Sequence, residues 1–196
     1  DLTSQLLRNA LRVTKIIESA IYNDLKEQGI VGSLFTEEWA DARDEPMQAI
    51  VETFLDYAND LRVWLVPFFF KKWLISVYRK CASLAVEELL SGNTPKMISC
   101  DSATLANRLR QDAGYIRQHF EEAFRRYGIS NERVGFAGEL NALFLLADFF
   151  EDMDYRTLET GELPDSAKLL LHEFPRELCE NVILRLLDIR SRSVFE

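Results

Sequence analysis

The stretch "IVETFLDYANDLRVWLVPFFFKKWLISVYRKCASLAVEELL", residues 50–90, holds two helical patterns that meet at Pro67. At its centre, residues 61–73 read "LRVWLVPFFFKKW", with three phenylalanines and two lysines directly after the proline. A proline inside a helix removes one backbone hydrogen bond and clashes with the preceding turn. Because no Ser, Thr, Asp or Asn precedes Pro67 to cap a new helix, the sequence favours one long kinked helix over a reversing turn.

The apolar side chains around Pro67 could form a membrane anchor, a partner site or a buried bend. The longest apolar run, residues 63–70, contains the proline and is far shorter than the roughly 20 residues that a membrane-spanning helix needs. Three consecutive helical residues spread over about 200° of the circumference, so the phenylalanines cannot all face one way. We interpret the segment as a buried bend with Phe69 in the core. Full burial predicts that Phe69→Ala lowers the free energy of unfolding by about 3–5 kcal/mol.

The other long segments also carry the helical period, most clearly residues 102–127. Similar patterns predict helices over residues 2–28, from Pro46 onward, and from about 134 to 152, with two shorter helices near the end of the chain. No segment shows the alternation of a strand. The sequence therefore predicts an all-α fold of elongated antiparallel helical bundles, with portions 1–99 and 100–196 packed as one continuous rod. Its predicted core includes Leu105, Leu109, Ile116, Phe120, Phe124, Phe69, Val182 and Leu186.

Composition narrows the classes of function. The chain has 196 residues, is 47% hydrophobic and carries a formal net charge of −9, which argues against nucleic acid as a partner. The three cysteines are far apart and form no CxxC pair, which favours a reduced, cytosolic setting. Because the chain begins at Asp1 rather than Met, we expect it to be a fragment of a longer protein.

Catalytic and metal-binding patterns are missing. The two histidines, His119 and His172, lack the Glu three residues earlier that a di-iron bundle requires. An EF-hand loop starting at Asp152 fails because Thr157 takes the place of glycine and Leu163 that of the bidentate glutamate. Phosphate-loop, dinucleotide and nucleophile-elbow motifs do not occur. We predict no catalytic, metal or cofactor-binding residues, no cofactor and no enzymatic activity.

Four basic residues follow Pro67 on one side of the predicted helix: Lys71, Lys72, Arg79 and Lys80. A dense basic patch can bind anionic lipid, although recognition sites of this kind are usually denser than this one. The simpler interpretation is a solvated helix face, and both interpretations stay open from the sequence.

The order of these pieces resembles the C-terminal region of the exocyst subunit Sec6 family. After "SLFTEEW", the segment with Phe54, Leu55 and Asp56 resembles the family's aromatic helix, and Pro67 with the following phenylalanines and lysines resembles its proline–aromatic–basic junction. Further on, "DAGYIRQHF" at 112–120 and "EFPRELCENVILRLLDIR" at 173–190 resemble two later family patterns. Two departures, Arg176 and the ending "Arg-Ser-Arg", keep animal paralogues of the M-Sec type open.

The resemblance implies the stacked helical bundles of multisubunit tethering complexes and a non-catalytic role. It implies a scaffold or protein-interaction module of the exocyst, which acts in vesicle tethering and exocytosis at the plasma membrane. The partners it implies are other exocyst subunits, plasma-membrane SNAREs and Sec1/Munc18-type regulators. An M-Sec-like paralogue would instead be a phosphoinositide-binding or membrane-remodelling module.

Overall fold

The computed structural model describes residues 2–43, 45–90, 102–130, 136–152, 165–166 and 168–169. Within these ranges every regular element is a helix, which confirms the predicted all-α class. In chain order the named elements are α1 (Leu2–Glu27), the short 3-10 helix η1 (Val31–Ser33), α2 (Glu37–Ala40), α3 (Pro46–Trp64), α4 (Pro67–Leu90), α5 (Ser102–Arg126) and α6 (Phe136–Asp152).

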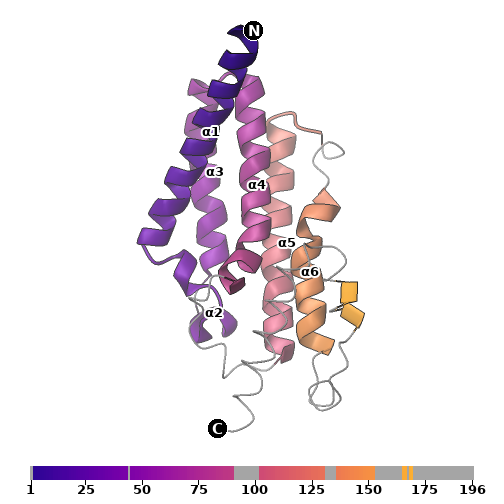
Figure 1. The fold of residues 1–196 in the computed structure, drawn as a ribbon. Coiled ribbons are helices and arrows are strands. Elements are labelled where there is room, and N and C mark those ends of the chain that lie inside the picture. The colour runs from indigo at the N-terminus through magenta and orange to yellow at the C-terminus, as the bar shows by residue number, and fades with distance from the viewer. Residues whose placement is uncertain are drawn as a thin grey trace.

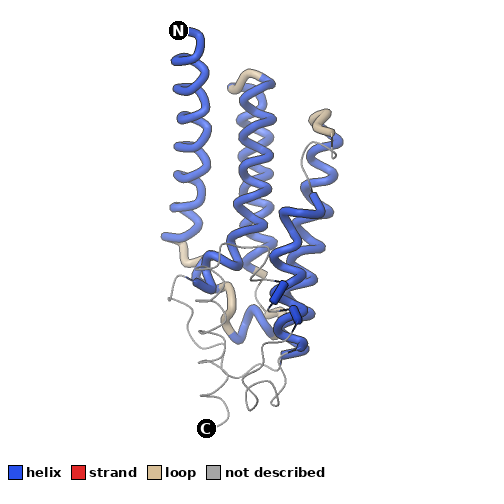
Figure 2. Tube along the Cα trace, turned by 45° about the vertical axis from the view of Figure 1, so that its right-hand side comes forward, coloured by secondary structure: helices blue, strands red, loops and turns tan. Residues whose placement is uncertain are grey.

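The five long helices lie side by side along one axis and alternate in direction (Figure 1). Helices η1 and α2 lie at the end of the bundle opposite the N-terminus. Helix α6 packs on α4 and α5, while α3 packs on α4 and α5. Helix α1 packs chiefly on α4 and stands at the edge of the bundle, as the second view shows (Figure 2). The predicted division at residue 100 stays a prediction.

Local signals explain several helix boundaries. Gly29 follows α1 with φ +81° and Gly128 follows α5 with φ +63°, a backbone region that glycine adopts without steric cost. The Thr36 side chain accepts a hydrogen bond from the Trp39 backbone N–H and caps α2. Pro46 occupies the first turn of α3, where its missing N–H is no loss. These boundaries agree with the sequence pattern.

The predicted kinked helix at Pro67 is wrong. Helix α3 ends at Trp64, only Leu65 and Val66 intervene, and α4 starts at Pro67 and runs back beside α3. Proline disfavours helical backbone in Val66, the residue before it, and the chain is already extended one residue earlier, at Leu65, with φ −94° and ψ 139°. Since the proline also fits the first turn of α4, one residue both ends the first helix and starts the next. The chain therefore reverses in a tight helical hairpin.

The core is aromatic and centres on α5. The Tyr78 ring on α4 lies 5.4 Å from the ring of Phe120 and 5.8 Å from that of Phe124, measured between centroids. The side chains of Leu105, Leu109, Ile116, Phe120 and Phe124 are all buried. Phe69 is only half-buried, so its predicted place in the fully buried core is a correction, and Phe70 is the buried member of the triplet. Val182 and Leu186 lie outside the described residues.

One buried polar contact ties α2 to α5. The Trp39 indole N–H donates to Asp112 Oδ2 at 2.9 Å, and Arg108 Nε lies 3.7 Å from Asp112 Oδ1. Burial raises the pKa of Asp112 to about 6, against the lowering effects of the Trp39 hydrogen bond and the Arg108 charge. The free energy of unfolding therefore depends on pH through this carboxyl group, which lies where α2 packs on α5.

Candidate functional site

The turn between α3 and α4 exposes four large apolar side chains at one end of the bundle. Val63 is 74% exposed, Trp64 81%, Val66 61% and Phe68 52%. We call these four residues the α3–α4 tip. The interpretation of this segment as a buried bend is therefore wrong. These side chains stand where α3 ends and α4 begins, at the end of the hairpin, and the described residues leave each of them more than half exposed.

Contacts just below the tip fix it to the end of α5. Lys71 Nζ donates to the carbonyl oxygen of Gly128 at 2.8 Å, directly after α5. The Phe70 ring meets the Tyr127 ring edge to face at 4.9 Å between centroids. The Tyr127 hydroxyl in turn donates to Asn59 Oδ1 at 3.0 Å, which links α3 to the same point. The tip is thus held on three helices rather than on a loose loop.

A second apolar surface runs along α1. Leu6, Val13 and Ile16 are exposed, the last at 66%, and Ala20 is exposed beside them. Their spacings of seven, three and four place them on one side of the helix, as in a coiled-coil seam. We call these four residues the α1 outer face. The wide apolar stripe of α1 is therefore only partly covered, by α4.

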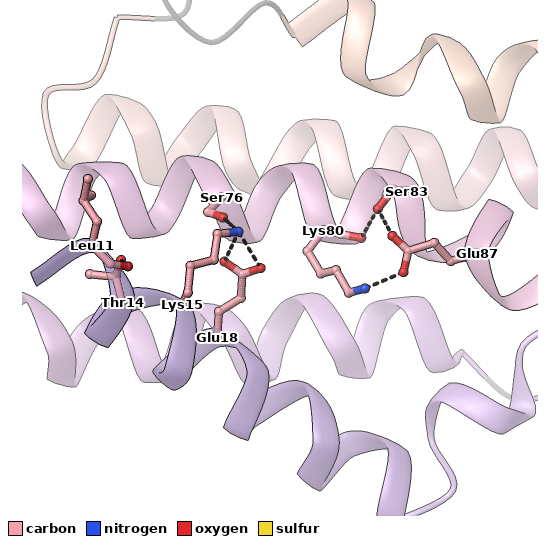
Figure 3. Close-up of polar contacts among 8 residues, drawn as sticks. All are labelled: Leu11, Thr14, Lys15, Glu18, Ser76, Lys80, Ser83 and Glu87. Carbon is pink, nitrogen blue, oxygen red and sulfur yellow. Dashed lines mark hydrogen bonds and ion pairs between the residues drawn. The ribbon is translucent and has the colours of Figure 1, made fainter. Parts of the chain in front are cut away.

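A polar groove of about 740 Å³ lies between α1 and α4. Lys15 Nζ donates to Ser76 Oγ at 2.7 Å and lies 3.3 Å from Glu18 Oε1 (Figure 3). One turn further on, Lys80 forms an ion pair with Glu87, which also accepts from the hydroxyl of Ser83 at 2.7 Å. Two carboxylates inside the groove therefore offset its cations.

The structure divides the four basic residues that the sequence placed together. Lys72, Arg79 and Lys80 line the α1–α4 groove, whereas Lys71 reaches to Gly128 at the end of α5. Lys80 also lies over the Tyr22 ring, 4.4 Å from its centroid. Lys71, Lys72, Arg79 and Lys80 consequently do not form one continuous patch.

The contacts of Cys81 and His119 are those of side chains that support the fold. Cys81 is a free, buried thiol, and burial raises its pKa, which keeps it protonated and unreactive. His119 Nδ1 lies 3.0 Å from the carbonyl oxygen of Tyr115, and the two rings stack at 3.9 Å between centroids. His172 and residues 153–164, which include most of the rejected calcium loop, lie outside the described residues.

The described part of the chain has neither a metal-binding cluster of side chains nor a helix that could cross a membrane. No group of three His, Cys, Asp or Glu side chains in those residues is placed to hold a metal ion. None of the helices described there has the length and apolar content that a membrane crossing requires.

Sequence reasoning missed both apolar surfaces as candidate sites. For the α3–α4 tip the signal was available: the restriction that proline places on the preceding residue predicts a break at Val66. For the α1 outer face the helical period shows which apolar residues share one side of the helix, but not that α4 covers only part of them.

The family comparison matches nearly the whole chain. The family model described as exocyst complex component Sec6 matches residues 2–192. No curated protein and no solved structure gives a significant match. The match spans every helix described above, from α1 to α6. The chain therefore belongs to the Sec6 family of exocyst components.

Proposed function

We propose that this chain is a non-catalytic scaffold and protein-interaction module of the exocyst, acting in vesicle tethering during exocytosis. The match of the Sec6 family over residues 2–192 carries the proposal. A location in the cytoplasm, peripheral to the plasma membrane at sites of exocytosis, follows from the same role. Other exocyst subunits are the first expected partners, and plasma-membrane SNAREs and Sec1/Munc18-type regulators are further ones.

The α1 outer face supports this role because it suits another helix. Leu6, Val13, Ile16 and Ala20 form an exposed apolar seam with heptad-like spacing, which an amphipathic helix of another subunit can cover. The small Ala20 allows a partner helix to approach closely at the lower end of the seam. We expect a subunit of the exocyst to bind here through apolar contacts.

The test is capture of the other exocyst subunits, one at a time, by the whole 196-residue chain. SNAREs and Sec1/Munc18-type regulators form separate arms of the same experiment. A double variant, Val13→Ser with Ile16→Ser, places two polar side chains in the middle of the seam. A matched control, Val63→Ser, changes an equally exposed valine on α3.

We expect at least one subunit to bind the unchanged chain and the control, and to be lost from the double variant. Removing two apolar contacts from a helix–helix seam weakens binding by about tenfold or more, at roughly 0.8 kcal/mol for each buried methylene-sized group. Failure of every exocyst subunit to bind would contradict the scaffold proposal. If the double variant binds the subunit as well as the unchanged chain does, the interface lies elsewhere than on the α1 outer face.

A further inference from the structure

We propose that the α3–α4 tip inserts into the headgroup layer of a membrane that contains anionic lipid. The inserting side chains are those of Val63, Trp64, Val66 and Phe68, and the cations beside them contact lipid headgroups. This contact is a second function of the chain, separate from the binding of subunits by α1.

The first argument is the composition and exposure of the tip. Two valines, a tryptophan and a phenylalanine occur within six residues, and each is more than half exposed. Tryptophan suits the boundary between water and lipid, because its ring is apolar and its indole N–H keeps a hydrogen bond. Side chains at a helical hairpin can enter this boundary about 5–10 Å deep, as surface-bound helices do.

The second argument is the charge around the tip. Residues 2–14 and 61–75, which exclude the ion pairs of the groove, hold five of the chain's 23 Lys and Arg residues and none of its 32 Asp and Glu residues. Helices α1 and α4 both begin at the end of the bundle that carries the tip (Figure 1), and Leu11 and Lys72 line the same groove. A chain with a net charge of −9 therefore has one end free of carboxylates on these two helices.

Several of these cations are exposed and can face lipid. Arg8, Arg12, Arg62 and Lys72 are exposed, while Lys71 already has a partner within the chain. The acidic residue nearest to the tip in sequence is Asp60, about one helical turn before Trp64 on α3. The exposed apolar side chains thus lie at the end of the hairpin, with exposed cations next to them in the sequence of α3 and α4 and on the neighbouring α1.

The third argument is that the tip is rigid. The Lys71–Gly128 hydrogen bond and the Phe70–Tyr127 ring contact hold the base of the hairpin against α5. An apolar group that is fixed outside the core loses little conformational freedom when it enters a membrane. An amphipathic partner helix binds along an extended apolar surface. The α1 outer face provides such a surface, whereas the two-residue turn at the tip is too short to do so.

The chain carries its own reporter for this contact. Of the three tryptophans, Trp39 and Trp73 are buried and Trp64 is exposed. Only Trp64 can therefore shift its emission to shorter wavelength and be quenched by brominated acyl chains on insertion. Subtracting the spectrum of a Trp64→Phe variant isolates its signal. The probes are phosphatidylcholine vesicles with and without phosphatidylserine, added to the whole chain.

Two double variants separate the apolar and electrostatic parts while keeping Trp64. In Val66→Ser with Phe68→Ser, the first serine stands before Pro67, where a hydroxyl can cap α4, so the fold is kept. Its vesicle partition should fall by about tenfold or more. In Arg62→Ala with Lys72→Ala, the fall should be roughly fivefold per cation and disappear at high salt. Circular dichroism checks that each variant is folded.

The α1 variant, Val13→Ser with Ile16→Ser, is the matched control, because it removes the same kind of exposed side chain elsewhere. It should keep vesicle binding whether or not it loses subunit binding, so failure of the scaffold proposal and failure of the membrane proposal are distinguishable. The proposal is overturned if vesicles containing phosphatidylserine neither bind nor shift Trp64. It is also overturned if the tip variant binds them unchanged, or if Trp64 responds to an exocyst subunit and not to vesicles.

Discussion

Helix α5 and the α3–α4 tip use the same kinds of side chain with opposite outcomes. Phe120 and Phe124 of α5 are buried, because α3, α4 and α6 all pack around this helix. Trp64 and Phe68 of the tip are exposed, because the hairpin ends there. The difference shows that an apolar side chain is buried only where the topology supplies a neighbour. An apolar group without one is available for binding.

The sharpest test of this comparison pairs Phe120 with Phe68. We expect Phe120→Ala to lower the free energy of unfolding by about 3–5 kcal/mol, because it opens a cavity beside the Tyr78 and Phe124 rings. We expect Phe68→Ala to change it by less than about 0.5 kcal/mol, as for most exposed positions. Urea denaturation followed by circular dichroism measures both. Equal losses would contradict the assignment of α5 to the core and of Phe68 to the surface.

A second expected effect concerns the polar part of the core. The folded-state pKa of Asp112, about 6, lies above its usual 3.8, so the folded chain binds this proton more tightly than the unfolded chain. The stability it contributes is then fully present below about pH 4 and is lost as the pH rises from 4 through 6. At 1.36 kcal/mol per pKa unit the loss is at most about 3 kcal/mol.

The variant that checks this is Asp112→Asn, which keeps an acceptor for the Trp39 indole N–H but cannot ionise. Its free energy of unfolding relative to the unchanged chain should rise between pH 4 and pH 7, as measured by chemical denaturation. Glu45→Gln is the control, since Glu45 lies 3.6 Å from the same Arg108 but is exposed. A difference that does not change with pH would show that Asp112 ionises normally in the fold.

Much of the fold could be predicted from local signals, and the candidate sites could not. Gly29, Thr36, Pro46 and Gly128 act through backbone geometry or a local cap, which depends on a few neighbouring residues, and each marks a helix boundary in the structure. At Pro67 two local rules conflict. The absence of a capping residue favours a kinked helix, whereas the restriction on the residue before proline favours a break, and the structure has the break.

Exposure, in contrast, depends on residues far away in the sequence. The period of α1 shows which residues share a face, but not that α4 covers only one side of a wide stripe. Similarly, the triplet 68–70 must spread around its helix. That Phe70 is the one that turns inward follows from Tyr127, which a different helix brings to it.

The triplet gives a finer version of the same comparison. Phe69 is half-buried and lies 5.3 Å from the exposed Phe68 ring, centroid to centroid. We expect Phe69→Ala to lower the free energy of unfolding by about 1–2 kcal/mol, between the values for a core and a surface phenylalanine. Thermal and urea denaturation measure it beside Phe68→Ala. A loss as large as that of Phe120→Ala would instead indicate that the Phe69 side chain is fully buried.

The smallest expected effect separates two adjacent lysines. Lys71→Ala removes the hydrogen bond to Gly128, at the negative end of α5, and should cost about 0.5–1 kcal/mol. Lys72→Ala should cost less than about 0.5 kcal/mol, since Lys72 is exposed. In vesicle binding we expect the order to reverse, because Lys72 is exposed and free to contact headgroups in the proposed complex, whereas the Lys71 ammonium group is bonded to Gly128. An equal response of both lysines in both measurements would mean that Lys71 does not hold the tip, and that the tip does not owe its rigidity to α5.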